Sequence, residues 1–130
     1  MTKRLFITLF TMCMVAVSAL ADGKSAEATF VTKTHDFGTI KEANGPVTCT
    51  FEFTNTGDKP LLIIDATAAC GCTRPEYPSK PIKPGKKGTI KVTYSPIGRP
   101  GPFKKTVKVK TNGSERTTTL RIEGTVIPKQ

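Results

Sequence analysis

The sequence contains no tryptophan and a single histidine, His35, among its 130 residues. Its three methionines, Met1, Met12 and Met14, all lie near the N-terminus. A buried tryptophan and a disulfide between the sheets mark the antibody type of immunoglobulin domain. The missing tryptophan, with no cysteine in residues 103–110, therefore excludes that type. One histidine also excludes a blue-copper site, which takes two, and no nucleophile–histidine–carboxylate arrangement is visible around it.

The first 21 residues have the parts of a secretory signal peptide. Two basic residues, Lys3 and Arg4, precede an apolar run over residues 5–20, which ends in an Ala-Leu-Ala exit. The run is short for a spanning helix, and no stop-transfer pattern follows it. The sequence therefore predicts export to the periplasm or the outside of the cell, with no transmembrane helix after cleavage. It also predicts a flexible leader over residues 22–28 and one domain over residues 29–130.

The rest of the chain shows no helical periodicity and about seven short stretches that favour β-strands. The clearest is residues 47–54, where apolar and polar residues alternate, so that one face of the strand points into a core. Residues 89–94 and 103–110 alternate in the same way, whereas residues 61–66 are apolar enough to predict a strand that is buried on both faces or close to it. Proline and glycine clusters separate the stretches, and residues 74–85 read as irregular. The pattern predicts an all-β, immunoglobulin-like sandwich without an antibody-type disulfide.

Several short motifs together resemble known domains. A first set resembles the entry of Hydin-type, major-sperm-protein-like immunoglobulin domains: Asp36-Phe37-Gly38, Phe51-x-Phe53-x-Asn55-Thr56-Gly57 and Pro60-Leu61. With a second set, the chain is similar to an exported bacterial family of domains of unknown function: Cys70-Gly71-Cys72-Thr73, Pro81-Ile82-x-Pro84-Gly85 and Gly101-x-Phe103. The resemblance implies an immunoglobulin-like sandwich and export, and it implies no established activity.

Cys70 and Cys72, separated by Gly71, are the most conspicuous chemical feature of the sequence. We expect Gly71 to allow backbone angles that turn the two sulfurs toward each other. Three interpretations stay open: a structural disulfide or inert packing, a reducible disulfide for redox chemistry, and a thiolate pair for a soft ion such as Cu(I) or Zn(II). Two thiolates make an incomplete zinc site, so no metal or other cofactor is predicted. Thiol oxidoreductases use Cys-x-x-Cys at a helix start, and here no helix is predicted, although Arg74 offers a nearby positive charge.

Cys49 lies on the inward face of the predicted strand over residues 47–54. Its simplest interpretation is a small core residue. The alternative is a resolving thiol for Cys70 or Cys72, which requires the strand of Cys49 to lie beside the Cys-Gly-Cys loop. Signal cleavage leaves these three cysteines, so at least one thiol stays unpaired within the chain or pairs between chains.

Basic residues outnumber acidic residues by 20 to 10, which gives a formal net charge of +10. On the predicted strand over residues 103–110, Lys104, Lys108 and Lys110 share the outward face. Such a face attracts an anionic component of the cell envelope or keeps an exported domain soluble. Arg74 and Tyr77 are further candidate contacts for a partner. Nucleic acid is not an expected partner, because export is predicted and no exposed aromatic residues for base stacking are evident.

These features favour a non-enzymatic, exported binding module whose partner is a protein or an anionic envelope component. Such a sandwich binds by strand addition at an edge or through its loops. The Cys-Gly-Cys loop and the proline-rich residues 74–85 form the candidate surface. The alternative is a thiol-redox protein acting through Cys70 and Cys72, and a weaker alternative is a soft-metal carrier using the same pair. No catalytic residue is assigned.

Overall fold

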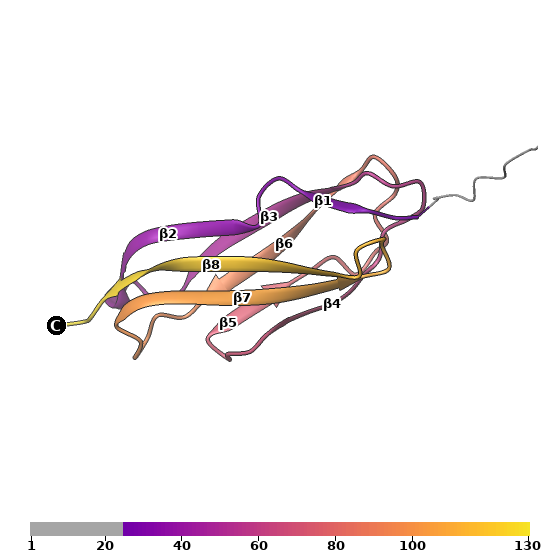
Figure 1. The fold of residues 1–130 in the computed structure, drawn as a ribbon. Coiled ribbons are helices and arrows are strands. Elements are labelled where there is room, and N and C mark those ends of the chain that lie inside the picture. The colour runs from indigo at the N-terminus through magenta and orange to yellow at the C-terminus, as the bar shows by residue number, and fades with distance from the viewer. Residues whose placement is uncertain (1–24) are drawn as a thin grey trace, which may run out of the picture.

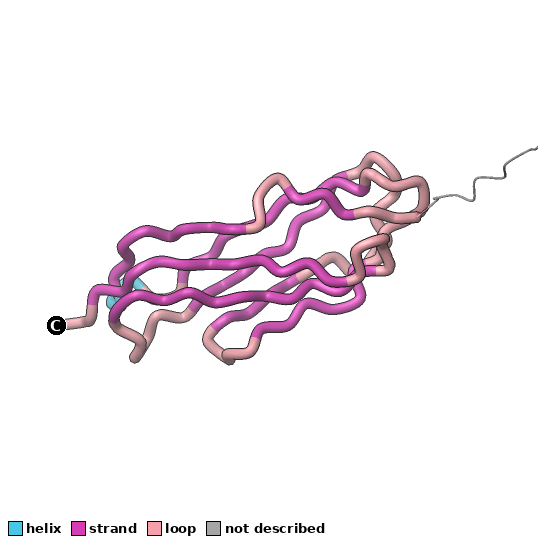
Figure 2. The backbone as a smooth tube through the Cα atoms, in the orientation of Figure 1, coloured by secondary structure: helices cyan, strands magenta, loops and turns pink. Residues whose placement is uncertain are grey.

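A computed structural model describes residues 25–130 as two facing β-sheets of four strands each (Figures 1 and 2). One short 3-10 turn, η1 (Glu42–Asn44), precedes β3. Sheet I has the strand order β1 (Ala28–Phe30), β3 (Val47–Asn55), β6 (Lys87–Tyr94) and β5 (Thr73–Glu76). Sheet II has the order β2 (Thr34–Lys41), β8 (Thr117–Ile127), β7 (Gly101–Thr111) and β4 (Ile63–Ala68). The predicted all-β, immunoglobulin-like sandwich is confirmed, with eight strands in the described part rather than about seven.

Alternating residues of the strands build one core between the two sheets. Phe51 and Phe53 of β3 and Ile90 and Val92 of β6 are fully buried, as the period of two predicts. Sheet II contributes the predicted inward residues of β7 and β8, which are Val107, Val109, Leu120, Ile122 and Val126. Removing these apolar side chains from water is the main driving force for the fold.

An aromatic stack joins the two sheets. Tyr94 of β6 in sheet I and Phe103 of β7 in sheet II stack with ring centroids 4.0 Å apart and an angle of 15° between their planes. Phe103 also lies over Gly124, its ladder partner on β8, where a Cβ atom would come within 2.9 Å of the ring. This stack links the sheets in a domain that lacks the tryptophan and inter-sheet disulfide of antibody domains.

Residues 25–27, just before β1, pack against the folded domain, whereas residues 22–24 of the predicted flexible leader lie outside the described residues. Ala26 is buried, and its carbonyl accepts a hydrogen bond from the N–H of Ser114 at 2.9 Å. Gly57 lies so close to this segment that a Cβ atom would overlap the segment's backbone. The predicted signal peptide lies outside the described residues. Within residues 25–130, no helix has the length and hydropathy needed to cross a membrane.

β4 is buried on one face only, so the predicted burial of residues 61–66 on both faces is wrong. β4 is an edge of sheet II, and Leu62 and Ile64 are 38% and 55% exposed. A register shift between Ile63 and Asp65 leaves Ile64 at a bulge, a feature common on sheet edges. The stretch after Cys72 is more regular than predicted, because it begins with β5, an edge strand that tolerates its proline.

The short 3-10 turn η1 lies at the end of the sandwich that holds the C-terminus (Figure 2), and its Glu42 connects three segments there. Its Oε2 accepts a hydrogen bond from the N–H of Gly98 at 2.8 Å, and its Oε1 accepts one from the N–H of Lys129 at 2.9 Å. These two hydrogen bonds lower the pKa of the Glu42 carboxyl, and the bond from Gly98 has the larger effect. The ionised carboxylate therefore fastens the loop before β7 and the C-terminal residues to η1.

We expect this tie to loosen in acid. Because the pKa of Glu42 in the folded state lies below its ordinary value of 4.5, its stabilising effect is full above that pH and is lost as the pH falls through the lower value. An NMR titration should show the amide protons of Gly98 and Lys129 shifting together in this range. In Glu42→Gln the two amides should not titrate in this way. Shifts that persist in Glu42→Gln would contradict the assignment.

Candidate functional site

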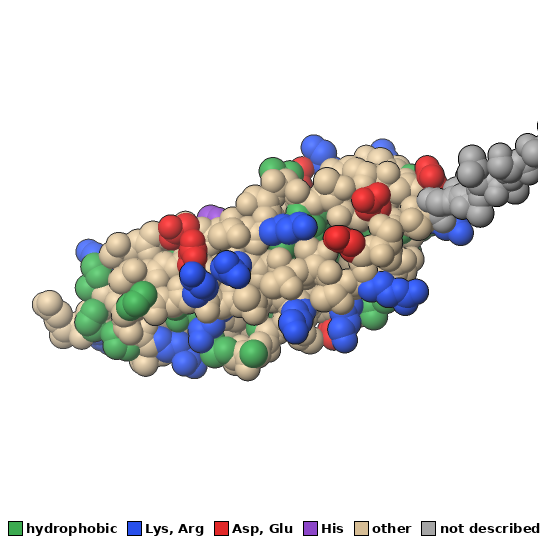
Figure 3. Space-filling model, in the orientation of Figure 1, with side chains coloured by type: hydrophobic (Ala, Val, Ile, Leu, Met, Phe, Trp, Pro, Cys, Tyr) green, Lys and Arg blue, Asp and Glu red, His purple; other side chains and the backbone are tan. Residues whose placement is uncertain are grey.

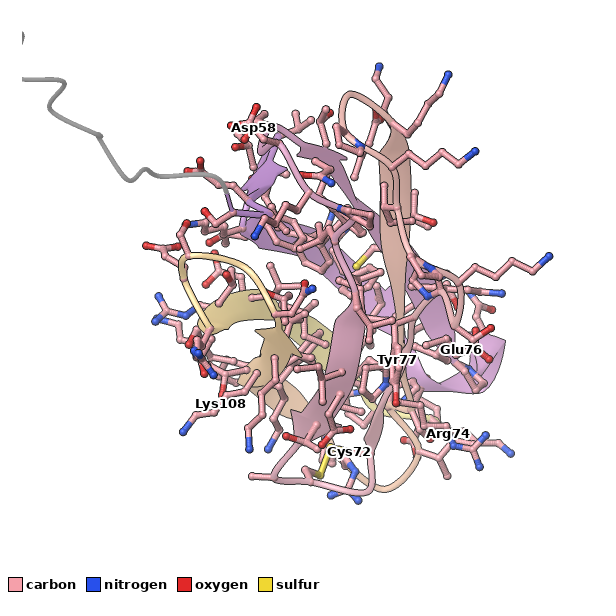
Figure 4. The ribbon with its side chains drawn as sticks, turned by 90° about the vertical axis from the view of Figure 1, so that its right-hand side faces the viewer. Asp58, Cys72, Arg74, Glu76, Tyr77 and Lys108 are labelled. Carbon is pink, nitrogen blue, oxygen red and sulfur yellow. A yellow bond between two sulfur atoms is a disulfide. The ribbon has the colours of Figure 1, made fainter. Side chains whose placement is uncertain are left out.

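The Cys-Gly-Cys stretch lies in the arch, residues 69–72, that carries the chain from β4 in sheet II to β5 in sheet I. Cys70 and Cys72 are joined by a disulfide bond, with their Cα atoms 5.1 Å apart. Figure 4 shows Cys72 at the periphery of the molecule. The expected role of Gly71 is wrong, because Gly71 has no positive φ and a Cβ atom there would meet open space. The arch therefore forms this bond without a conformation reserved for glycine.

The two sulfurs of the arch have different surroundings. Cys70 is half-buried, whereas Cys72 is 3% exposed. The backbone N–H of Cys72 donates to the Sγ of Cys70 at 3.1 Å, and the Sγ of Cys72 lies 3.5 Å from the Oγ1 of Thr73. Two backbone bonds hold the arch: Thr73 N–H donates to the carbonyl of Cys70 at 3.1 Å, and Ser95 N–H donates to that of Cys72 at 2.8 Å.

Cys49 of β3 is a buried thiol of the core and takes part in no disulfide. Burial raises the pKa of the Cys49 thiol to about 11, so it stays protonated at neutral pH. Cys49 pairs with Val92 of β6, and Val92 pairs on its other side with Pro75 of β5. One whole strand therefore separates β3 from β5, which is a distance of about 10 Å between strand axes. The strand of Cys49 is therefore not a neighbour of β5, although Pro46, just before β3, lines the same hollow as Cys72.

Two hollows flank the disulfide, and each has a cationic side chain in its wall. One, of about 340 Å³, is lined by Cys70, Lys104 and Lys105, and the other, of about 310 Å³, by Cys72 and Arg74. Lys105 was not among the predicted site residues. It occupies an inward position of β7, opposite Ile122, and is half-buried. A lysine at an inward position of an alternating strand is the sequence signal that could have found it.

The weak metal candidates, Cys70 and Cys72, are bonded to each other. Metals bind thiolates, so a soft ion at this pair would require its reduction. Among residues 25–130, no group of three or more histidine, cysteine, aspartate or glutamate side chains is placed to hold a metal ion. A site of this kind would therefore need ligands from a second molecule.

The outer face of sheet II carries the predicted lysines. Lys104, Lys108 and Lys110 of β7 point outward beside Arg121 of β8, and all four are exposed. We call these four residues the basic face. Figure 3 shows blue side chains spread over β7 and β8. One ion pair is formed there within the described residues, between Lys104 and Glu123 at 4.0 Å.

On the outer face of sheet I, by contrast, two lysines form ion pairs with glutamates. Lys87 lies 3.3 Å from Glu52, and Lys91 lies 3.7 Å from Glu76. Exposed pairs of this kind contribute little to stability, but they cancel the local field that would attract an anion. On the outer face of sheet II, Lys108, Lys110 and Arg121 form no ion pair within the described residues, although Asp65 of β4 lies opposite Lys110 in the ladder; on sheet I the cation left unpaired among these strands is Arg74.

The predicted partner-binding residues do not form one surface. Arg74 points outward on β5, on the opposite face of the sandwich from Lys104, Lys108 and Lys110. Tyr77 follows the end of β5 and is partly exposed. Figure 4 shows Arg74 and Lys108 on different sides of the molecule. Sequence periodicity correctly predicted that the three lysines share a face. The position of Arg74 depends on the pairing of β5 with β6, which periodicity does not predict.

Comparison with known proteins matches this architecture to a family. Residues 28–126 match the model of DUF1573, described as "Protein of unknown function (DUF1573)". The chain belongs to the DUF1573 family. The match spans all of the strands described above except the last residue of β8. No curated protein matches this DUF1573 chain.

Three solved structures resemble this DUF1573 domain at low identity, which shows the fold alone. A protein of unknown function from Porphyromonas gingivalis W83 gives a TM-score of 0.69 at 14% identity over 85% of this chain and 51% of that chain. This chain thus spans about half of that protein. The ASH/PapD-like domain 7 of human CEP192 gives 0.67 at 14% identity over 88% and 94%. The VesB protease of Vibrio cholerae gives 0.59 at 12% over 77% and 31%.

Proposed function

We propose that this DUF1573 protein is an exported, non-enzymatic binding module whose partner is an acidic polysaccharide of the cell envelope. The observation that carries the proposal is the basic face, whose cations Lys108, Lys110 and Arg121 have no acidic partner within 4.0 Å among the described residues. Uncompensated cations on one face concentrate an anionic partner there. The immunoglobulin-like sandwich also supports an interaction role, because such a domain exposes loops and sheet faces to which a partner can bind.

The spacing of the basic face suits a linear polymer. Alternate residues of a strand lie about 6.8 Å apart, so Lys104 to Lys110 spans about 20 Å along β7. Threonine hydroxyls lie among the cations: Thr106 is opposite Arg121, and Thr119 is opposite Lys108. Ammonium groups bind carboxylates, and hydroxyls exchange hydrogen bonds with sugars. The face thus offers both kinds of contact that an acidic sugar chain presents.

The edges formed by β5, β4 and β2 are poorly suited to the other route, strand addition, which needs backbone N–H groups that are not yet bonded, and the fourth edge strand, β1, has only 3 residues. On β5, Pro75 has no N–H, and Thr73 already donates to the arch. On β4, the N–H of Ala66 donates to the carboxylate of Asp65 at 2.9 Å. On β2, Gly38 donates in the same way to Asp36 at 2.7 Å. A face is therefore the better candidate surface than an edge.

A membrane surface is the less suitable anionic partner. Binding to a bilayer interface combines basic residues with large apolar side chains that enter the lipid. Of the exposed large apolar residues, Leu62 and Ile64 at β4 and Ile127 at the end of β8 flank the basic face, whereas Thr106 and Thr119 lie among the cations themselves. The combination of hydroxyls and cations favours a polysaccharide.

The first test is binding to polygalacturonate, a carboxylated polysaccharide, with dextran as the neutral control. A triple variant, Lys108→Gln with Lys110→Gln and Arg121→Gln, removes three cations from the basic face. At about 0.5 kcal/mol for each exposed contact, we expect a loss of about 1.5 kcal/mol, or roughly tenfold in Kd. The remaining binding should depend less steeply on salt.

The matched control removes the same charge from the other sheet. Lys87→Gln, Lys91→Gln and Arg74→Gln change three cations on the outer face of sheet I. We expect this variant to keep most of the parent affinity. Equal losses in the two triple variants, or parent protein that binds anionic vesicles and not polygalacturonate, would overturn the proposal.

Export has a separate test. If residues 1–21 are a signal peptide, protein expressed with its full sequence should begin at Asp22 when purified from the periplasm or the medium, as intact mass shows. Full-length protein retained in the cytoplasm would contradict export without bearing on the basic face.

A further inference from the structure

The Cys70–Cys72 bond contributes little to holding the fold together. It closes a loop with a sequence separation of 2, so breaking it frees very little of the unfolded chain. It joins two residues of one arch and connects no pair of distant strands. The backbone of the arch is already fixed by the bonds from Thr73 N–H and Ser95 N–H. The arch should therefore keep its shape when the bond is reduced.

The two sulfurs also differ in access from solvent. Cys70 is half-buried and lines the hollow that contains Lys104 and Lys105, whereas Cys72 is buried. A thiolate arriving through this hollow reaches the Sγ of Cys70 first. Lys104 is 4.0 Å from Glu123, but Lys105 has no ion pair within the described residues, so its charge acts on whatever enters.

We propose that the arch is a thiol–disulfide exchange site for an anionic dithiol, with Cys70 as the reactive sulfur and Cys72 as the resolving sulfur. In the forward direction, one thiolate of the dithiol attacks the Sγ of Cys70. A mixed disulfide forms, the Cys70–Cys72 bond breaks, and Cys72 leaves as a thiolate beside the Thr73 hydroxyl, which lies 3.5 Å away. The second thiolate of the dithiol then displaces Cys70. The partner is oxidised to a disulfide, and the arch gains two electrons.

The reverse direction uses the same asymmetry. Cys70 attacks the disulfide of the partner, and Cys72 resolves the mixed disulfide. The N–H of Cys72, 3.1 Å from the Sγ of Cys70, favours the Cys70 thiolate by donating a hydrogen bond to it. This N–H takes the place of the positive potential that a helix start gives Cys-x-x-Cys enzymes, whereas the Lys105 ammonium, in the wall of the same hollow, attracts the anionic partner. Cys49 has no part, because β6 lies between its strand and β5. The proposal is independent of polysaccharide binding.

The reactivity of the two sulfurs can be compared in single-thiol variants. With Cys49→Ala in the background, Cys72→Ser exposes the thiol of Cys70, and Cys70→Ser exposes that of Cys72. We expect Cys70 to react with dithionitrobenzoate, an anionic disulfide, about tenfold faster or more than Cys72 does. Circular dichroism checks that both variants are folded. Equal rates in folded variants would overturn the assignment of Cys70 as the reactive sulfur.

Comparing an anionic probe with a neutral probe distinguishes the effect of the Lys105 charge from the effect of its packing. Lys105→Gln in the Cys72→Ser protein should slow the reaction with dithionitrobenzoate several-fold. It should leave the reaction with dithiodipyridine, a neutral disulfide, unchanged. Lys91→Gln, on the outer face of sheet I, is the matched control and should change neither rate. An equal slowing with both probes would show that Lys105 acts through structure and not through charge.

The parent protein tests exchange itself. In glutathione buffers that span the poise of oxidising compartments, Cys70–Cys72 should open and close reversibly while the circular dichroism spectrum stays native. A bond that stays closed in these buffers until the protein is unfolded would overturn the proposal and make the disulfide structural. Loss of polysaccharide binding would leave this result unaffected.

Discussion

Asn55→Ala is expected to lower the free energy of unfolding by about 4 kcal/mol, because it leaves several buried backbone groups without partners. Asn55 is 0% exposed. Its Nδ2 donates to the carbonyls of Lys59 and Ile82 at 2.7 and 2.8 Å. Its Oδ1 accepts from the N–H groups of Gly57 and Glu27 at 2.9 and 3.3 Å. One side chain thus connects the turn after β3 to the segment before β1 and to the loop before β6.

An isosteric substitution separates hydrogen bonding from shape. Asn55→Asp keeps the volume but places carboxylate oxygens against the carbonyls of Lys59 and Ile82, so we expect at least the same loss at neutral pH. The loss should be smaller in acid, where a protonated carboxyl donates one of the two bonds. Equal losses at both pH values would contradict this account of Asn55.

Asn112→Ala is the matched control. Asn112 makes two similar bonds, from Leu62 N–H at 2.8 Å and to the Pro60 carbonyl at 3.2 Å, but it is exposed. Water can replace these bonds, so we expect a loss of about 1 kcal/mol. Urea unfolding followed by circular dichroism measures all three variants, since a single domain of this size is expected to unfold in one step. An effect at Asn55 no larger than that at Asn112 would contradict the importance of burial.

The buried role of Asn55 was not predictable from the sequence, although the strand that contains it was. Alternation over residues 47–54 is a local signal, and it decides which side chains face the core. Two of the four partners of Asn55, Glu27 and Ile82, are far away in the chain, and the alternation carries no information about them. The same limit applies to Ile64, which is exposed because β4 is an edge strand with a bulge.

The sequence predicted only those parts of the candidate site that depend on local features. The spacing of Cys70 and Cys72 and the outward lysines of β7 are local features, so the sequence identified both. The difference in burial between the two cysteines depends on which strand the arch contacts, through Ser95 after β6. Lys105 belongs to the site because β4, β5 and β7 meet at the hollow beside Cys70. Which strands lie side by side depends on the strand order of the sheets, and local sequence periodicity does not predict that order.

The aromatic stack between the sheets leads to the other large expected effect. Phe103→Ala removes a ring that contacts Tyr94 from the facing sheet and covers Gly124 on the neighbouring strand. The glycine has no side chain to fill the space, so the cavity cannot close easily. We expect the free energy of unfolding to fall by about 3–5 kcal/mol, measured by urea unfolding.

A double-mutant cycle shows whether the stack itself joins the two sheets. Phe103→Leu keeps most of the apolar volume, so its loss should be well below that of Phe103→Ala. Combining Phe103→Leu with Tyr94→Leu should give a coupling energy of about 1 kcal/mol, the usual value for an aromatic pair. Because Tyr94 and Phe103 lie on different sheets, this coupling measures an inter-sheet contact directly. Additive losses would mean that the two rings stabilise their own sheets separately, and that general apolar burial holds the sandwich together without a tryptophan or an inter-sheet disulfide.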